Sequence, residues 1–249
     1  MKALITGATS GIGRDMAMIL AKRGIDLIIA SRDTKKMTLL AKRLPVNVKI
    51  VTVDLSKESD CYYLYNEVKS EDIDILINNA GFGAFGYSWE VSLETEMNML
   101  DLNVRAVHIL TKLFLQDFRE KDSGYILNVA SSAGFLAGPL MSTYYATKSY
   151  VLRFTEAIHE ELRQTGSRVK ISALCPGHVE TGFDKRANVR HSIGGVSSEK
   201  VAEAGIDGMF RGDVVILPGA LMKLTYIGEK FLTEGLMLKA AFLAQSKKG

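Results

Sequence analysis

The sequence predicts an α/β fold in which about seven parallel strands lie between two layers of helices within a single domain. Three observations lead to this prediction. Short apolar runs alternate with longer segments whose apolar residues recur at helical spacing. A glycine-rich turn follows the first run, and polar residues follow several of the others. Strands joined by helices run parallel, so their carboxyl ends meet at one edge, where open sheets of this kind bind ligands.

The composition is that of an ordinary globular protein of 249 residues, with 47% hydrophobic and 24% charged residues. The formal net charge of +3 is too small to indicate a nucleic-acid partner. Cys61 and Cys175 are far apart, which favours a reducing, cytoplasmic location over a disulfide framework. The amino terminus is too short for the apolar core of a signal peptide, and no apolar run reaches the ~18 residues of a membrane span.

The first strand, residues 3–5, leads into a glycine turn at residues 6–13, and a helical segment follows. Strand, glycine turn and helix are the setting of a phosphate-binding loop, because glycines admit a pyrophosphate and the helix start offers free N–H groups. The Gly-x-Gly-x-x-Gly spacing is not met, since Met16 occupies the position of its third glycine. The turn has the pattern Thr-Gly-x-x-x-Gly-x-Gly instead. We expect it to contact a cofactor through Gly7, Thr9, Ser10, Gly11, Ile12 and Gly13.

A second strand, residues 27–30, ends at Ser31 and Arg32. In dinucleotide-binding folds an acidic residue here binds the ribose 2′-hydroxyl of NAD, whereas an arginine accommodates the 2′-phosphate of NADP. Ser31 occupies the acidic position and Arg32 follows it, which predicts NADP(H) rather than NAD(H). Asp33 is the opposing feature, and capping of the next helix is its alternative role.

Strands expected at residues 48–53 and 73–77 continue the alternation. The first ends at Asp54 and Leu55. An acidic side chain at this point can accept a hydrogen bond from adenine, or it can cap the following helix. The second strand runs into the sequence Asn-Asn-Ala-Gly at residues 78–81.

The glycine turn, Asp54 and the Asn-Asn-Ala-Gly sequence, in this order, resemble the cofactor-binding half of the classical short-chain dehydrogenase/reductase family. The resemblance extends over residues 1–219 and implies a Rossmann-type fold. In that family the Asn-Asn-Ala-Gly turn stabilises the central sheet and passes beside the adenosine ribose. The resemblance therefore adds three expected cofactor contacts, Asn79, Ala80 and Gly81.

Tyr144 and Lys148 are four residues apart, so they lie about one turn from each other on one face of a helix. A nearby ammonium group favours the phenolate, so we expect Lys148 to lower the pKa of Tyr144 from its usual ~10. A strand at residues 124–130 ends at Ser131, on the ligand-binding edge. In the resembled family the catalytic serine stands thirteen residues before the catalytic tyrosine. That spacing selects Ser131, Tyr144 and Lys148, and it excludes Tyr145, which is three residues from Lys148.

The resemblance implies an NADP(H)-dependent oxidoreductase that reduces a ketone or aldehyde, or oxidises the secondary alcohol. Ser131 polarises the substrate oxygen, Tyr144 exchanges a proton with it, and Lys148 holds the nicotinamide ribose in this reading. In the family an asparagine at the position of Asn103 holds a water molecule that links the lysine to solvent; simple helix packing is the alternative. Ketoacyl and hydroxysteroid substrates both remain open. The alternative function is a cofactor-binding regulator without turnover.

Other catalytic templates are not met. The sequence His159-Glu160-Glu161 begins like a zinc motif, but Arg163 occupies the position of the second histidine. We therefore expect no metal site.

After a strand expected at residues 169–174, a Pro-Gly turn matches the one that passes the nicotinamide in the resembled family. The resemblance adds four cofactor contacts there, Pro176, Gly177, Val179 and Thr181. Residues 182–198 are expected to form a substrate loop. A helix at residues 198–210 and a last strand and turn at residues 214–219 follow.

The apolar tail, residues 220–249, has three competing uses: closing the substrate pocket, forming a subunit interface, or lying on a membrane surface. The helix that carries Tyr144 has an apolar face, which the resembled family often uses in dimers, and packing within the subunit is the alternative. We expect a homodimer or homotetramer with a small-molecule carbonyl or alcohol substrate, no nucleic-acid partner and no transmembrane segment.

Overall fold

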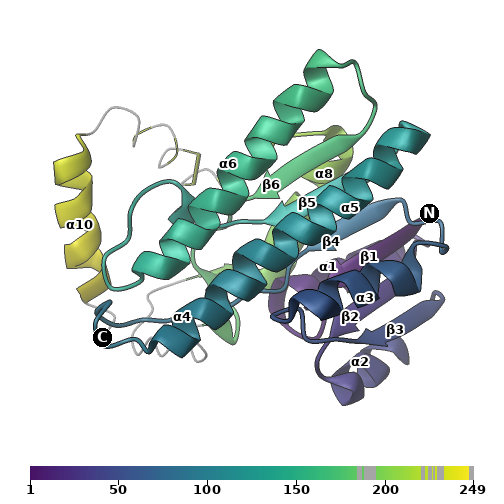
Figure 1. Cartoon of the computed structure of the whole chain (residues 1–249), viewed down its shortest axis with the longest axis horizontal. Coiled ribbons are helices and arrows are strands. Elements are labelled where there is room, and N and C mark those ends of the chain that lie inside the picture. The colour runs from purple at the N-terminus through teal and green to yellow at the C-terminus, as the bar shows by residue number, and fades with distance from the viewer. Residues whose placement is uncertain are drawn as a thin grey trace.

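A parallel sheet forms the centre of the computed structural model, which describes residues 1–183, 187, 195–219, 222, 223, 226, 228 and 233–246 (Figure 1). The strands are β1 Lys2–Thr6, β2 Asp26–Ser31, β3 Val48–Thr52, β4 Ile75–Asn78, β5 Tyr125–Val129, β6 Lys170–Leu174, β7 Val179–Glu180, β8 Val196–Ser197 and β9 Val215–Ile216. Seven of them pair in the order β3–β2–β1–β4–β5–β6–β9, and every pairing is parallel. The predicted fold class is therefore confirmed.

Helices cover both faces of this sheet (Figure 1). They are α1 Gly11–Lys22, α2 Thr34–Ala41, α3 Glu58–Val68, α4 Leu93–Leu100, the π-helix η1 Asp101–Arg105, α5 Ala106–Lys121, the 3₁₀ turn η2 Ser132–Gly134, α6 Ser142–Gln164, α8 Ser198–Arg211 and α10 Glu234–Ser246. Helices α1, α2 and α8 pack on one face, and α3, α5 and α6 pack on the other. Helix α10 lies outside both layers, on the side of the molecule where α6 begins.

Neighbouring residues of β1 belong to opposite cores. Ile5 packs with Met16 of α1 and Ile206 of α8, whereas Leu4 packs with Phe114 of α5. All of these side chains are buried. Side chains alternate across a strand, so a strand that is covered on both faces must be apolar at every position. This explains why the strands read as continuous apolar runs in the sequence.

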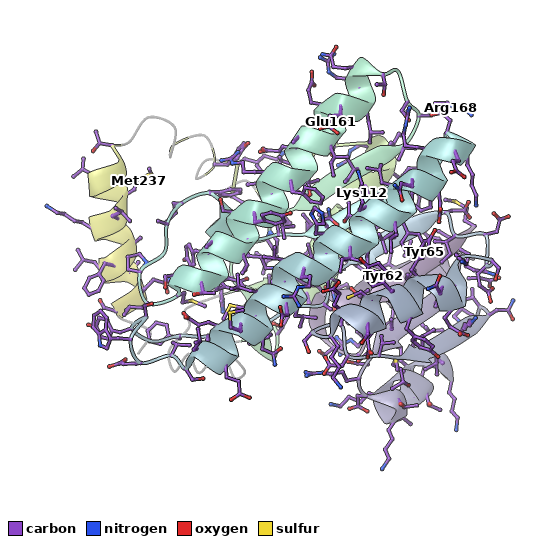
Figure 2. The ribbon with its side chains drawn as sticks, viewed as in Figure 1. Tyr62, Tyr65, Lys112, Glu161, Arg168 and Met237 are labelled. Carbon is purple, nitrogen blue, oxygen red and sulfur yellow. The ribbon has the colours of Figure 1, made fainter. Side chains whose placement is uncertain are left out.

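The helices of one layer are also joined by polar contacts. Tyr65 of α3 donates a hydrogen bond to Asp117 of α5 over 2.9 Å, and its ring packs edge-on against Phe114. Figure 2 shows Tyr62 and Tyr65 on α3, in the layer that also contains Lys112 of α5. Burial and the bond to Asp117 raise the pKa of Tyr65 to about 12. Tyr65 therefore stays a hydrogen-bond donor between the two helices.

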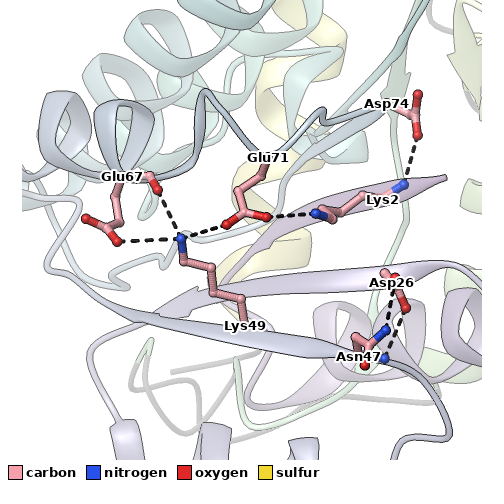
Figure 3. A network of polar contacts seen from close by, with 7 residues as sticks. All are labelled: Lys2, Asp26, Asn47, Lys49, Glu67, Glu71 and Asp74. Carbon is pink, nitrogen blue, oxygen red and sulfur yellow. Dashed lines mark hydrogen bonds and ion pairs between the residues drawn. The ribbon is translucent and has the colours of Figure 1, made fainter.

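Charged side chains meet at the amino ends of the strands (Figure 3). The Lys2 ammonium lies 2.7 Å from Glu71, and the Lys49 ammonium lies 3.0 Å from Glu71 and 3.5 Å from Glu67. The backbone N–H of Lys2 donates to Asp74 over 2.9 Å. These contacts join β1 and β3 to the end of α3 and the start of β4.

The structure differs from the sequence prediction in its last third. The last strand, β9, comprises two residues within the strand and turn that were predicted at residues 214–219. β7 and β8 form a small second parallel sheet that was not predicted. Most of the predicted substrate loop at residues 182–198, and part of the tail at residues 220–249, lie outside the described residues. Within the described part of the chain, no helix is both long enough and apolar enough to cross a membrane.

Candidate active site

A cleft of about 870 Å³ opens at the carboxyl ends of the strands. It collects nearly all of the residues that the sequence predicted for the cofactor and for catalysis. These are Gly7, Thr9, Ser10, Gly11, Ile12, Ser31, Arg32, Asp54, Leu55, Asn79, Ala80, Gly81, Ser131, Tyr144, Lys148, Pro176, Gly177, Val179 and Thr181. Two predicted residues, Gly13 and Asn103, do not line the cleft and lie behind its wall.

The glycine turn is held against the end of β4. The Asn79 amide nitrogen donates to the carbonyl oxygens of Thr6 and Gly7, each over 3.0 Å. A Cβ added at Gly13 would collide with this Asn79 amide. Gly7 has a φ of +67° and Gly11 a φ of +54°, conformations that favour glycine. These glycines are thus required for the turn to approach its neighbours closely.

The cleft beside this turn fits a dinucleotide pyrophosphate. The residue that precedes α1, Ser10, forms no side-chain cap, so the first N–H groups of the helix remain available to an anion. A Cβ at Gly11 would lie 3.0 Å from the Thr181 methyl group, which brings the segment after β7 over the turn. Because Gly11 carries no side chain of its own, phosphate oxygens can approach the backbone closely at this point.

Met16, at the position of the missing third glycine, is fully buried. A Cβ added at Gly205 of α8 would lie 2.9 Å from the Met16 Cε atom. The close packing that a third glycine supplies in other dinucleotide folds is here provided by a glycine on a different helix.

Ser31, Arg32, Asp33 and Lys36 line the far end of the cleft. The Asp33 carboxylate accepts a hydrogen bond from the Lys36 backbone N–H over 2.9 Å and lies 3.1 Å from the Lys36 ammonium. These contacts lower the pKa of Asp33, the backbone hydrogen bond most. The helix-capping role weighed for Asp33 is therefore confirmed, and its charge is countered by Lys36.

Asp54 lies further along the same wall. Its carboxylate accepts hydrogen bonds from the hydroxyl group of Ser56 over 2.8 Å and from the Ser56 N–H over 3.3 Å. The residue at the N-cap of α3 is Lys57, so the alternative of Asp54 as that cap is wrong. Asp54 instead closes a local turn beside the cleft.

Tyr144 and Ser131 are adjacent at the other end of the cleft. The Ser131 side-chain oxygen accepts a hydrogen bond from the Ala133 N–H over 3.1 Å, which leaves its own proton to donate. Burial raises the pKa of Tyr144 to about 12, against the smaller lowering effect of a hydrogen bond with Ser131. Tyr144 is thus a neutral phenol at neutral pH.

Lys148 is buried one helical turn after Tyr144, and its ammonium lies 5.9 Å from the centre of the Tyr144 ring. The Lys148 Nζ atom donates to the carbonyl oxygen of Val129 over 2.7 Å. Burial lowers the pKa of Lys148 to about 8. The pKa of Tyr144 is raised, and not lowered as expected from its spacing to Lys148, because exclusion of water from the buried phenol is the largest cause of the shift.

Asn103 is fully buried in the π-helix η1. Its side chain accepts a hydrogen bond from the Phe82 N–H over 3.1 Å and donates to the Phe82 carbonyl oxygen over 2.8 Å and to Thr147 over 3.1 Å. A Cβ at Gly81 would lie 2.9 Å from Asn103 and 3.6 Å from the Lys148 ammonium. Asn103 therefore fastens the loop after β4 to the helix that carries Tyr144 and Lys148. The predicted role in a water relay stays a prediction.

The sequence did not identify several residues that line the cleft near Tyr144. They are mostly aromatic or apolar, with one amide: Phe82, Met141, Tyr145, Phe183 and Gln245. Phe82 belongs to the loop after β4. Gln245 comes from α10, so the tail contributes at least one described residue to the cleft. Closing the substrate pocket with the tail stays a prediction.

A sequence model described as short chain dehydrogenase matches residues 1–191. The chain is 30% identical over 237 residues to the very-long-chain 3-oxoacyl-CoA reductase of Anas platyrhynchos, covering 87% of this chain and 75% of the relative. Among solved structures, a short-chain dehydrogenase from Sphingobium yanoikuyae in complex with NADPH superposes with a TM-score of 0.85 and 29% identity, covering 95% of this chain and 94% of its own.

A second solved structure, a short-chain dehydrogenase/reductase from Burkholderia phymatum in complex with NAD, has a TM-score of 0.83 and 27% identity, with 91% of each chain covered. The two similar structures thus hold different nicotinamide cofactors. The match over residues 1–191, the parallel sheet and the glycine turn agree: this chain belongs to the short-chain dehydrogenase/reductase family and is an NAD(P)-dependent oxidoreductase.

Proposed function

We propose that the protein is an NADP(H)-dependent carbonyl reductase that also runs in the alcohol-oxidising direction, with Tyr144 as its acid and base. The observation that carries this proposal is the convergence of Ser131, Tyr144 and Lys148 at one end of a cleft whose other end carries Arg32. The family's reaction needs a proton donor beside the reacting carbon and a cofactor site within the same cleft.

Ser131 donates its hydroxyl proton in a hydrogen bond to the substrate carbonyl oxygen, and so stabilises the negative charge that develops there. Tyr144 transfers its phenolic proton to the same oxygen. A bound nicotinamide cofactor supplies or accepts the hydride when it occupies the cleft. Tyr144, with a pKa of about 12, holds its proton until an alkoxide forms beside it, and this suits it to act as an acid in the reductive direction.

Lys148 keeps a positive charge below a pH of about 8 and lies on the same side of α6 as Tyr144. As that charge is buried, it favours any transient negative charge on the Tyr144 oxygen. We also assign to Lys148 the binding of the nicotinamide ribose, by the family resemblance. Asn103 positions Lys148 and Tyr144 through Thr147, whose hydroxyl donates to the Tyr144 carbonyl oxygen over 2.7 Å.

The preference for NADP(H) is proposed from the charges at the far end of the cleft. Arg32 and Lys36 line this end. Asp33, the acidic residue between them in the sequence, is already bound to the Lys36 N–H and ammonium at the start of α2. A 2′-phosphate carries negative charge that an arginine binds well, whereas an acidic residue free to accept from a 2′-hydroxyl would favour NAD. Comparing kcat/KM for NADPH and NADH tests this; a clear preference for NADH contradicts it.

For the substrate, we propose a ketone, with 3-ketoacyl compounds and hydroxysteroids both kept as candidates. The relative named a very-long-chain 3-oxoacyl-CoA reductase supports the first. A panel of carbonyl compounds, followed by the loss of NADPH absorbance, tests the enzymatic reading. Absence of turnover across a broad panel, with cofactor binding intact, would instead support the alternative of a regulator that binds the cofactor without catalysis.

A further inference from the structure

Tyr145 follows the proposed catalytic tyrosine and faces the same cleft. Its ring lies flat on Gly138, where an added Cβ would overlap the ring atoms. The Tyr145 ring is nearly perpendicular to that of Tyr144, at 77°, and the ring centres are 6.2 Å apart. The position of Tyr145 is thus determined by packing on two sides, and it lines the same cleft as Tyr144.

Gln245 reaches Tyr145 from the opposite end of the chain. Its amide nitrogen donates a hydrogen bond to the Tyr145 hydroxyl oxygen, across a separation of 100 residues in the sequence. The Gln245 side chain is almost completely buried, with 4% of the residue exposed. The other end of the amide, the Oε1 atom, has no hydrogen-bond partner among the described residues. Buried polar atoms are normally paired, so this oxygen is an exception that needs a reason.

The Tyr145 hydroxyl group also has a hydrogen-bonding capacity without a partner among the described residues. It accepts from Gln245, and among the described residues the structure records no acceptor for its own proton. The surrounding wall is apolar: Met141 and Ala133 are buried beside Tyr144, with Phe82 and Phe183 packed against them. Among the described residues, a donor and an acceptor without partners therefore lie together beside this apolar cluster.

We propose that Tyr145 and Gln245 form a second polar subsite, which binds a hydroxyl group of the substrate in the part of the cleft that contains Tyr144. A hydroxyl group accepts from the Tyr145 O–H and, after the amide turns about its last bond, donates to the Gln245 oxygen. A methyl or ether group in its place leaves one or both protein groups unpaired in a dry site. Such sites strongly disfavour analogues that lack the hydrogen-bonding group. The subsite rests on the proposed function and narrows its substrates to hydroxylated ketones.

Two matched probes test the subsite: 4′-hydroxyacetophenone and 4′-methoxyacetophenone. Both para substituents donate electrons to the ring, but only the first carries an O–H. Binding is measured calorimetrically with saturating NADP⁺, so that no reduction takes place. We expect wild type to bind the hydroxy ketone about tenfold more tightly than the methoxy ketone. We expect Gln245→Leu and Tyr145→Phe each to remove most of this preference.

The matched controls are Gln164→Leu on the exposed end of α6 and Tyr62→Phe on the outer face of α3, which should keep the wild-type preference. Thermal unfolding of each variant checks that it is folded. Equal binding of the two ketones by wild type, no binding of the hydroxy ketone, or a preference that survives both subsite substitutions would overturn the proposal. NADPH consumption is measured separately: a binding preference without turnover leaves the subsite intact and counts only against the proposed function.

Discussion

The charged side chains at the amino ends of the parallel sheet keep their charges, whereas burial at the carboxyl ends favours neutral side chains. At the amino ends, Lys2, Lys49 and Glu71 are partly exposed and paired with one another (Figure 3). These contacts lower the pKa of Glu71 to about 2, through Lys2 first and Lys49 second, and Glu71 raises the pKa of Lys49. At the carboxyl ends, Tyr144 and Lys148 are buried. The pKa of Tyr144 is raised and that of Lys148 is lowered, so both shifts favour the neutral form of the side chain.

The difference lies in hydration rather than in the types of residue. Water remains at the amino ends, so the carboxylates and ammonium groups keep their charges and their pairing contributes little net stability. The cleft excludes water from Lys148, so a charge there is costly and can be given up near neutral pH. Ion pairs thus connect the elements at the amino ends of the sheet. At the carboxyl ends, burial gives Tyr144 and Lys148 pKa values that suit proton transfer.

The largest effect is expected from Tyr144→Phe. Removal of the phenolic proton should lower kcat/KM for ketone reduction by about 10³-fold, within the range of general acid catalysis. The fluorescence titration of NADPH should be unchanged within about twofold, because the ring and the cleft wall remain. Tyr62→Phe on the outer face of α3 is the control, and full turnover by Tyr144→Phe would remove Tyr144 from its assigned role.

Lys148→Met should lower kcat/KM by about 100-fold and at the same time stabilise the fold at pH 7. The folded pKa of about 8 lies below the reference value of 10.5, so the buried charge opposes folding below pH 8. Unfolded chains bind more protons than folded ones between these two values, and stability rises with pH there. We expect the gain to be roughly 2–3 kcal/mol at pH 7.

Urea unfolding of wild type and Lys148→Met at pH 7 and pH 9 measures this gain. It should shrink at pH 9, where the wild-type lysine is mostly neutral. A variant that is less stable than wild type at pH 7 would show that the Lys148 charge is stabilised by an opposite charge in the folded protein.

Arg32→Ala should raise KM for NADPH about tenfold, because one charged hydrogen bond to the 2′-phosphate is lost. KM for NADH should stay nearly unchanged, because NADH has no 2′-phosphate. Steady-state kinetics with both cofactors measure the difference. Arg163→Ala on the exposed part of α6, where Arg163 pairs with Glu160, serves as the matched control. An equal loss with both cofactors would mean that Arg32 does not contact a 2′-phosphate.

The smallest effect is expected at the amino ends of the strands. Glu71→Gln should lower the unfolding temperature only slightly, and about 1 M NaCl should remove most of the difference. Glu71 contributes its stability above its unfolded pKa near 4.5 and loses it as the pH falls toward 2, so the variant should be less sensitive to acid than wild type. A change in KM for either cofactor would contradict the separation of the two ends.

The parts of the fold that follow local rules were predictable. Strand, turn and helix around Gly7 and Gly11 were read correctly because apolar periodicity and glycine placement are properties of adjacent residues. Ser131, Tyr144 and Lys148 were predictable because their spacing along the chain matches that of the resembled family. The fold brings Ser131 and Tyr144 into contact.

The parts that depend on tertiary burial were not predictable. The direction of the Tyr144 pKa was mistaken, because a pair spacing does not reveal how much water the cleft excludes. The contact between Tyr145 and Gln245 joins helices far apart in the sequence, and neither residue belongs to a pattern. The π-helix that buries Asn103 arises within a segment that reads as ordinary helix.

Met16 packs against Gly205, so a glycine outside the glycine turn contributes to the packing of the helix that follows the turn. Met16 stands where the motif would place a glycine, and the space for its side chain is left by Gly205 on a helix in the second half of the chain. An alanine at position 205 would therefore be tolerated or harmful according to what stands at position 16, and the reverse holds as well. The effect of a substitution at either position thus depends on the residue at the other, and a search for glycines at fixed spacing does not detect this dependence.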